Sequence, residues 1–302
     1  MPVEWERIKK PVFLAGDETI AYRDPCAHYH EGVFRIWHTQ IHGTPGGDWH
    51  AVTAVVESKN LVRWGKPRVI TPVDKTLNYS SPGNVIRYKG RWVMCLQTYP
   101  APDGGQVGDQ TARVFTMASD NLKKWDEPEL IKVKGPDIPR ESMGRMIDPY
   151  LLEDKDEKGK WWCFYKQNGA SMSWSKDLKR WTYFGNVDAG ENVCLLVEKG
   201  KYVLFHSPKN GIGVKRSKNL ENWTDHGLIT LGQEEWPWAQ GRLTAGHVLD
   251  LRDEPDIGKY VMFFHGSSVE GCAVQETHGH ASLAFAWSDD LENWEWGGKA
   301  SG

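Results

Sequence analysis

A heptapeptide that occurs five times constrains the fold of this 302-residue chain more than any other feature of its sequence. The pattern is Ser-(Lys/Asp)-(Asn/Asp)-Leu-x-x-Trp, and such internal repeats are typical of architectures built from one repeated unit. Its copies span residues 58–64, 119–125, 175–181, 217–223 and 288–294. Ser and Asn/Asp hydrogen-bond their own backbone in turns, whereas Leu and Trp anchor a turn to a core. We therefore expect a turn between two strands at each copy.

A strand-like run precedes each copy, and a hairpin stands upstream in every unit. The hairpins read as an apolar strand, a charged turn that contains Gly and an aromatic-rich strand, as in ENVCLLVEKGKYVLFHS. Four strands per unit, five times over, predict an all-β fold, a five-bladed β-propeller with four-stranded antiparallel blades. A β-sandwich or a β-helix is the competing interpretation, which the strand count and the unit size disfavour.

No linker-like composition marks a second domain, so residues 1–302 are expected to form a single propeller domain. The segment 5–13, which precedes the first unit, is expected to close the ring by adding to the last blade. The sequence leaves the oligomeric state open.

The charge balance and the apolar runs exclude several classes of partner. With 37 Lys+Arg against 40 Asp+Glu, the chain has no surplus of positive charge for nucleic acid, and no apolar run reaches the roughly 18–20 residues that span a membrane. The start, MPVEWERIKK, lacks a signal peptide, which predicts a cytoplasmic location, or a periplasmic or secreted one if a signal peptide has been removed. Five scattered cysteines argue against a disulfide framework or a zinc site.

A polar residue stands at the start of the first apolar strand of each unit. These residues are Asp24, Asn84, Asp148, Glu191 and His247. Because the first strand of a propeller blade lines the axis, we expect the five side chains to surround a central pocket. Taken singly, each is more typical of a turn, a loop or a core. Together they bring three carboxyl groups close, which raises pKa values and favours one protonated acid beside ionised partners, as glycoside cleavage requires.

At these residues the sequence resembles the five-bladed propeller glycoside hydrolases of family 43 and its relatives, families 32 and 68, over essentially the whole chain. The resemblance implies that Asp24 is the general base, that Asp148 orients the substrate and tunes the pKa of the acid, and that Glu191 is the general acid. It also implies that His247 lies near the axis, where family 43 often holds calcium or its water shell. A structural calcium near His247 is therefore an expectation, and no cofactor is required.

The second unit departs from the family pattern. Family 43 often reads Trp-Ala-Pro-Asp there, whereas this chain has SSPGN at residues 80–84 and so lacks the charge. The Asn-Asp-Pro and Glu-Cys motifs of families 32 and 68 do not occur at the matching places, and the additional β-sandwich domain of many relatives is missing from this sequence.

Other residues are candidates for contact with a carbohydrate. Arg23 and Arg145 flank two of the carboxyl groups and can bind a carboxylate or a sugar hydroxyl, although a structural ion pair is an equal alternative. His278 belongs, with His280, to a long insertion in the fifth unit and can contact a substrate or a phosphate. Candidates for stacking on a sugar ring are Trp37, Trp49 and Trp238.

We therefore predict a glycoside hydrolase that acts on a short oligosaccharide or plant polysaccharide fragment. The expected substrate is a furanoside or pentoside, such as an arabinofuranoside or xyloside, cleaved from its end with inversion. One alternative is a glycoside phosphorylase, which clustering of Arg23, Arg145, Arg242, His278 or His280 around the axis would favour. The other is a non-catalytic carbohydrate-binding propeller, which needs aromatic platforms but no closely spaced acid and base.

Overall fold

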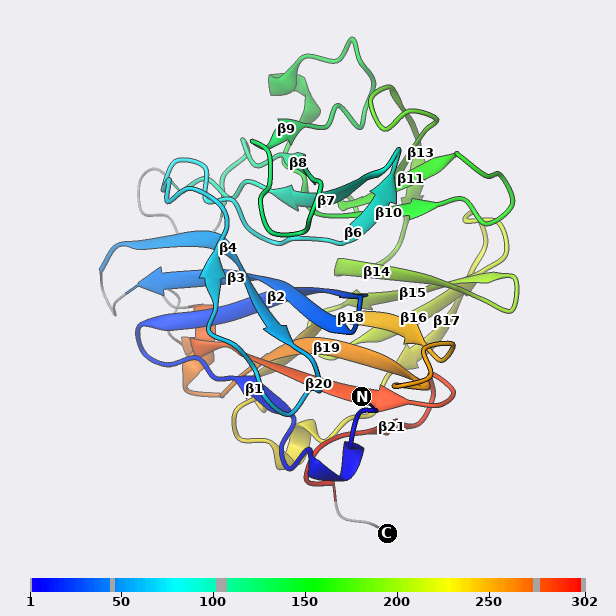
Figure 1. Ribbon diagram of the computed structural model, residues 1–302. Coiled ribbons are helices and arrows are strands. Elements are labelled where there is room, and N and C mark those ends of the chain that lie inside the picture. Colours follow the sequence, from blue (N-terminus) through cyan, green and yellow to red (C-terminus); the bar gives the residue numbers. More distant parts are fainter. Residues whose placement is uncertain (1, 44–46, 102–107, 274–277, 300–302) are drawn as a thin grey trace.

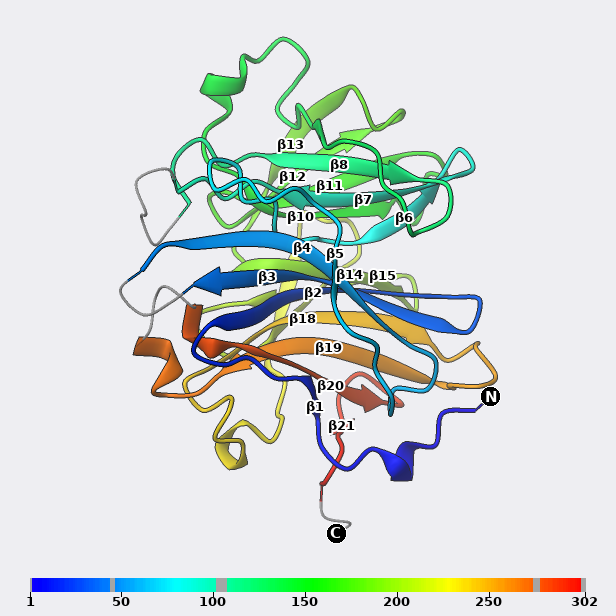
Figure 2. The ribbon, with the colours of Figure 1, turned by 60° about the vertical axis from the view of Figure 1, so that its left-hand side comes forward.

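Five antiparallel sheets stand around a common axis in the computed structural model, which describes residues 2–43, 47–101, 108–273 and 278–299. This arrangement confirms the predicted five-bladed β-propeller (Figures 1 and 2). Helix in the described ranges is confined to short 3₁₀ turns, none of which could cross a membrane. These turns are η1 (Trp5–Arg7), η2 (Arg140–Met143), η3 (Gln233–Glu235), η4 (Gly271–Ala273) and η5 (His278–His280).

Blades one to four each contain four strands in sequence order. Blade one has β2 (Ile20–His30), β3 (Val33–Gly43), β4 (Trp49–Ser58) and β5 (Arg68–Val69). Blade two has β6 (Val85–Tyr88), β7 (Arg91–Gln97), β8 (Val114–Ser119) and β9 (Glu129–Leu130). Blade three has β10 (Ile147–Glu153), β11 (Trp161–Lys166), β12 (Ala170–Ser175) and β13 (Trp181–Val187). Blade four has β14 (Glu191–Glu198), β15 (Lys201–Ser207), β16 (Gly213–Ser217) and β17 (Trp223–Leu228).

Blade five contains strands from both ends of the chain. Its sheet runs β18 (Arg242–Leu251), β19 (Lys259–Ser267) and β20 (Ser282–Ser288), and β21 (Trp294–Glu295) pairs with one end of β20. The other end of β20 pairs with β1 (Val12–Leu14), where Val12 lies opposite Ala284 (Figure 2). The segment before the first unit therefore closes the ring, as predicted.

The first strands of the blades face the axis and contact one another in turn. β2 contacts β6, β6 contacts β10, and the series continues through β14 and β18 back to β2. Large apolar side chains fill the spaces between the blades, among them the fully buried Phe164, Phe205 and Phe263. This packing fixes the five inner strands, so residues at their starts meet at one end of the axis.

The repeated heptapeptide forms the turn between the third and fourth strands of each blade. In the second copy, the buried Ser119 hydroxyl accepts a hydrogen bond from Leu122 N at 3.0 Å and donates one to the Lys124 carbonyl at 2.6 Å. All five motif leucines have a positive φ, between 57° and 68°. Left-handed backbone costs such a residue about 1–2 kcal/mol, which burial of the leucine side chain offsets.

Candidate active site

The inner strands share a backbone irregularity at the end of the axis where they begin. The register of β2, β10, β14 and β18 shifts near the start of each strand, which marks a bulge. One residue in each bulge, and one in the matching segment of blade two, has a positive φ between 44° and 58°. They are Asp24, Ser81, Asp148, Asn192 and Ala245. A bulge re-aims side chains, and here it turns the residues of five blades toward one point.

This alignment corrects the predicted set of axis residues. Asp24 and Asp148 stand at equivalent positions as expected, but Ser81, Asn192 and Ala245 occupy the other three. Glu191 precedes that position by one residue. The sequence reasoning missed Ser81 and Asn192, because an extra residue in a strand leaves no mark on its apolar pattern. One signal was present for Ser81, which precedes a proline as Asp24 and Asp148 do.

A cavity of about 460 Å³ opens at this end of the axis. Its volume falls within the range of small-molecule sites, roughly 300–1,000 Å³. The charged side chains of its wall come from blades one, three, four and five, or from the loops that lead into them. They are Arg23, Asp24, Arg145, Asp148, Glu191 and Arg242. The structure therefore brings together all three predicted carboxyl groups and three arginines.

Asp24 is held by neighbours on three sides. The Thr39 hydroxyl donates a 2.8 Å hydrogen bond to Oδ2, and Asn192 Nδ2 donates a 3.3 Å hydrogen bond to Oδ1. The backbone N–H of Asp24 donates to Nδ1 of the buried His265 at 3.1 Å. Thr39 also accepts a hydrogen bond from Ser81 N, which ties blade one to blade two beside the carboxylate. These contacts fix the orientation of Asp24 toward the cavity.

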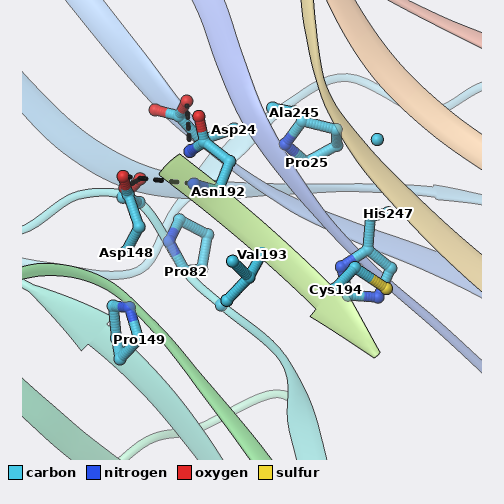
Figure 3. A pocket seen from close by; sticks show the side chains of 13 residues that line it. Asp24, Pro25, Pro82, Asp148, Pro149, Asn192, Val193, Cys194, Ala245 and His247 are labelled. Atoms are coloured by element: carbon cyan, nitrogen blue, oxygen red, sulfur yellow. Dashed lines mark hydrogen bonds between the residues drawn. The ribbon is translucent and has the colours of Figure 1, made fainter. Parts of the chain in front are cut away.

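Asp148 is the most buried of the three acids, with 7% of its surface exposed. The Ser81 hydroxyl donates a 2.7 Å hydrogen bond to Oδ1, and Asn192 N lies 3.4 Å from Oδ2. Figure 3 shows Asn192 between Asp24 and Asp148. Burial, followed by the negative charges of Glu191 and Asp24, raises the pKa of Asp148 to about 7. Asp148 is therefore partly protonated at neutral pH beside other carboxyl groups.

Glu191 begins β14 and pairs with Arg242, which begins β18. Arg242 Nη2 donates to Glu191 Oε1 over 2.6 Å, and both side chains remain about one-third exposed, at 31% and 32%. A charge-assisted hydrogen bond of this length fixes the position of the carboxylate.

Arg145 lies on the cavity wall with its guanidinium fixed from behind. Its Nε donates a 3.0 Å hydrogen bond to the Gly108 carbonyl, and its guanidinium carbon lies 5.6 Å from the centre of the Tyr99 ring. Of the three candidate tryptophans, Trp49 lines the same cavity.

Three predicted substrate contacts, Asn84, Trp37 and Trp238, do not line this cavity. Asn84 is buried between blades, where its side chain donates to the Leu151 carbonyl at 2.7 Å and accepts from Leu151 N at 2.9 Å. Trp37 is fully buried against Trp125. The Trp238 ring stacks on Trp236 with 5.2 Å between ring centres, and it does not line the cavity. The side chain of His278 lies outside the described part of the chain.

His247 lies deeper along the axis, in a narrow channel of about 20 Å³ below the acids (Figure 3). Burial lowers the pKa of His247 to about 4, so its ring is neutral at physiological pH. Calcium takes six to eight oxygen ligands, yet the described residues hold no group of three or more His, Cys, Asp or Glu placed for a metal. These side chains do not fit a directly coordinated calcium ion, whereas a calcium ion held near His247 through its water shell stays a prediction.

No protein-family model matches the sequence, and no curated protein matches it. Solved structures do match its shape. An exo-1,5-alpha-L-arabinanase from a bovine ruminal metagenomic library superposes with a TM-score of 0.63 at 16% identity, over 93% of this chain and 99% of that one. The chain has the fold of a glycoside hydrolase propeller.

Two further structures share this propeller fold. A family 117 glycoside hydrolase from Zobellia galactanivorans has a TM-score of 0.64 at 15% identity, over 93% of this chain and 90% of that one. A GH43 beta-xylosidase/alpha-arabinofuranosidase from a compost microbial metagenome has a TM-score of 0.60 at 14% identity, over 94% of this chain and 98% of that one. Enzymes with different named activities thus share the same five-bladed frame.

Proposed function

We propose that this propeller is a glycoside hydrolase whose reaction is carried by Asp24, Asp148 and Glu191. The observation that carries the proposal is the convergence of three carboxyl groups, from three blades, on one cavity at the axis. Mutual repulsion and burial make this arrangement costly for folding, and the raised pKa of Asp148 reflects that cost. Perturbed acids that line a cavity favour a catalytic function over a purely structural one.

In the proposed reaction, Asp24 takes a proton from water as that water attacks the anomeric carbon. Thr39 and Asn192 hold the carboxylate ready for this step. Glu191 acts in its protonated form: it takes up a proton from solvent once the substrate separates it from Arg242, and it gives that proton to the leaving oxygen. Asp148 orients the substrate beside the acid. Each proton transfer is typically worth about 10²–10⁴-fold in rate.

The proposed substrate is a furanoside or pentoside at the end of a short oligosaccharide. The arabinanase and xylosidase/arabinofuranosidase among the structural neighbours support this substrate class. A screen of aryl pentosides and furanosides, with Glu191→Gln as its control, tests the proposal. Release of the aryl group by the wild type and a loss of at least 100-fold in the variant would support it. Equal rates in both proteins would favour a non-catalytic sugar-binding propeller.

Inversion is the proposed stereochemical outcome, with water entering opposite the leaving group. Proton NMR of the first product formed distinguishes the two anomers before they equilibrate. A product that keeps the anomeric configuration of the substrate would assign a nucleophilic function to Asp24 instead.

A second candidate is phosphorolysis at the same site. The observation in its favour is the presence of Arg23, Arg145 and Arg242 on one cavity wall, since a phosphate co-substrate needs a cationic pocket. Product analysis with and without inorganic phosphate decides between the candidates, because a sugar 1-phosphate forms only in phosphorolysis.

A further inference from the structure

We infer that the cavity recognises a sugar residue that carries a carboxylate, and that Arg145 is the receptor for this group. The inference rests on the proposed function and narrows its substrate class to acidic oligosaccharides. In such a substrate the uronic acid is the neighbour of the furanoside or pentoside residue that is released.

The guanidinium of Arg145 is prepared for an anion. Its Nε is bound to the Gly108 carbonyl, and Gln167 Nε2 donates to the Arg145 carbonyl at 2.9 Å, so both the side chain and its backbone are anchored. The Tyr99 ring lies against the guanidinium. The two terminal nitrogens form the edge that binds carboxylates in a bidentate manner. Within the described ranges, no carboxylate forms an ion pair with Arg145.

The other charged side chains of the cavity have partners within the protein or carry less charge. Glu191 pairs with Arg242 over 2.6 Å, and Asp24 accepts hydrogen bonds from Thr39 and Asn192. Asp148 is partly protonated because of its burial, so it carries less than a full negative charge to compensate Arg145. A neutral sugar would cover Arg145 without compensating its charge, which costs free energy. A carboxylate compensates that charge.

Free phosphate is the other anion that Arg145 could bind in this cavity. Arg242 is already paired with Glu191, whereas Arg145 forms no ion pair with a carboxylate of the described residues. One bidentate guanidinium matches the single charge of a carboxylate, whereas a phosphate dianion calls for more cationic partners. Ile147 and Trp49 on the same wall offer apolar surface to a sugar ring, which a free phosphate would not use.

Titration calorimetry with free sugars tests the inference without requiring turnover. The probes are galacturonate against galactose, glucuronate against glucose, and inorganic phosphate alone. We expect the wild type to bind one of the uronates at least tenfold more tightly than its neutral counterpart. Arg145→Gln should reduce that ratio below twofold, Arg145→Lys should restore part of it, and Arg63→Gln, which removes an exposed arginine elsewhere, should leave it unchanged.

Three outcomes are distinguishable. Equal binding of each uronate and its neutral counterpart by the wild type would overturn the inference. Phosphate binding that depends on Arg145, without preference for a uronate, would overturn the sugar-borne carboxylate and point to phosphorolysis. An Arg145-dependent uronate preference in a protein that hydrolyses no glycoside would uphold the subsite while the proposed function fails. Thermal unfolding of each variant checks that a lost preference does not reflect lost folding.

Discussion

Arg242 and Glu191 form an ion pair across the boundary between blades four and five, with 2.6 Å between Nη2 and Oε1. Each residue is the first of the inner strand of its blade. The pair therefore joins two blades at the point where the proposed leaving group departs. It holds the carboxylate of Glu191 in place before substrate binds, and the substrate has to compete with Arg242 for it.

The first prediction concerns the leaving group. Glu191→Gln should lower kcat/KM by about 10²–10⁴-fold on an alkyl glycoside, because the departing alkoxide needs a proton. On a dinitrophenyl glycoside of the same sugar the loss should be below tenfold, because that group leaves without protonation. Steady-state rates on the two substrates provide the measurement. Glu221→Gln, at an exposed turn, is the control. An equal loss of kcat/KM on both substrates in Glu191→Gln would show that Glu191 is not the general acid.

Thr39→Val tests whether the orientation of Asp24 affects the reaction rate independently of the stability of the fold. The variant removes the hydroxyl that donates to Asp24 and accepts from Ser81 N, so kcat should fall about tenfold with little change in KM. Unfolding free energy should fall by about 1–2 kcal/mol, because a buried N–H loses its acceptor.

Thr71→Val is a matched control for this variant. The buried Thr71 hydroxyl follows β5, outside the residues that line the cavity, and it also accepts a hydrogen bond from a backbone N–H, that of Thr53, at 2.9 Å. Urea unfolding should show comparable destabilisation of both variants, while kcat falls only in the first. A similar fall in kcat in both would attribute the effect to stability alone.

Asp148→Asn should change how stability depends on pH. The folded protein binds the proton of Asp148 up to a pKa of about 7, whereas the unfolded chain releases it near 4. The stability due to this proton is full below about pH 4 and is lost as the pH rises to 7. Asn cannot ionise, so the variant should gain about 1–3 kcal/mol relative to the wild type between pH 4 and pH 8. Urea unfolding at pH 4 and at pH 8 measures this difference in unfolding free energy.

Asp137→Asn, at the surface, is the control and should show no such pH dependence. A difference between Asp148→Asn and the wild type that does not change with pH would refute the argument.

Ser119→Ala should weaken one blade turn without altering the cavity. The substitution leaves the N–H groups of Asn121 and Leu122 and the Lys124 carbonyl without the hydroxyl that binds all three. A loss of about 1–2 kcal/mol in unfolding free energy is expected, with unchanged kinetics. Ser142→Ala, at an exposed position, should have no effect on stability. Full stability in Ser119→Ala would show that water replaces the hydroxyl.

The blade count could be predicted because a single turn demands a rare set of residues. Leu122 and its four counterparts must adopt a left-handed backbone and still bury a side chain, and the preceding Ser and Asn must bind the turn. Such local requirements are visible in the sequence as particular residue types at fixed spacing. The three acids could be proposed for a similar reason, since each stands beside the start of an inner strand.

The exact orientation of the inner strands could not be predicted. A bulge inserts one residue without changing the apolar pattern, and a shift of one position moves a side chain to the opposite face. For this reason Asn192, rather than Glu191, matches Asp24 and Asp148. In blade two the matching residue is Ser81, three positions before Asn84, whose side chain binds the Leu151 carbonyl between blades. The pairing of Arg242 with Glu191 joins residues of two blades, which no local pattern encodes.

The pairing of β1 with β20 means that one of the first segments synthesised must wait for one of the last. While the ribosome is still making blade five, Val12 has no partner, and the sheets form an open arc with unpaired edges. Contacts this distant in sequence are slow to form. Closure of the circle is therefore a late event in biosynthesis, and the cavity acquires Arg242 only with the fifth blade.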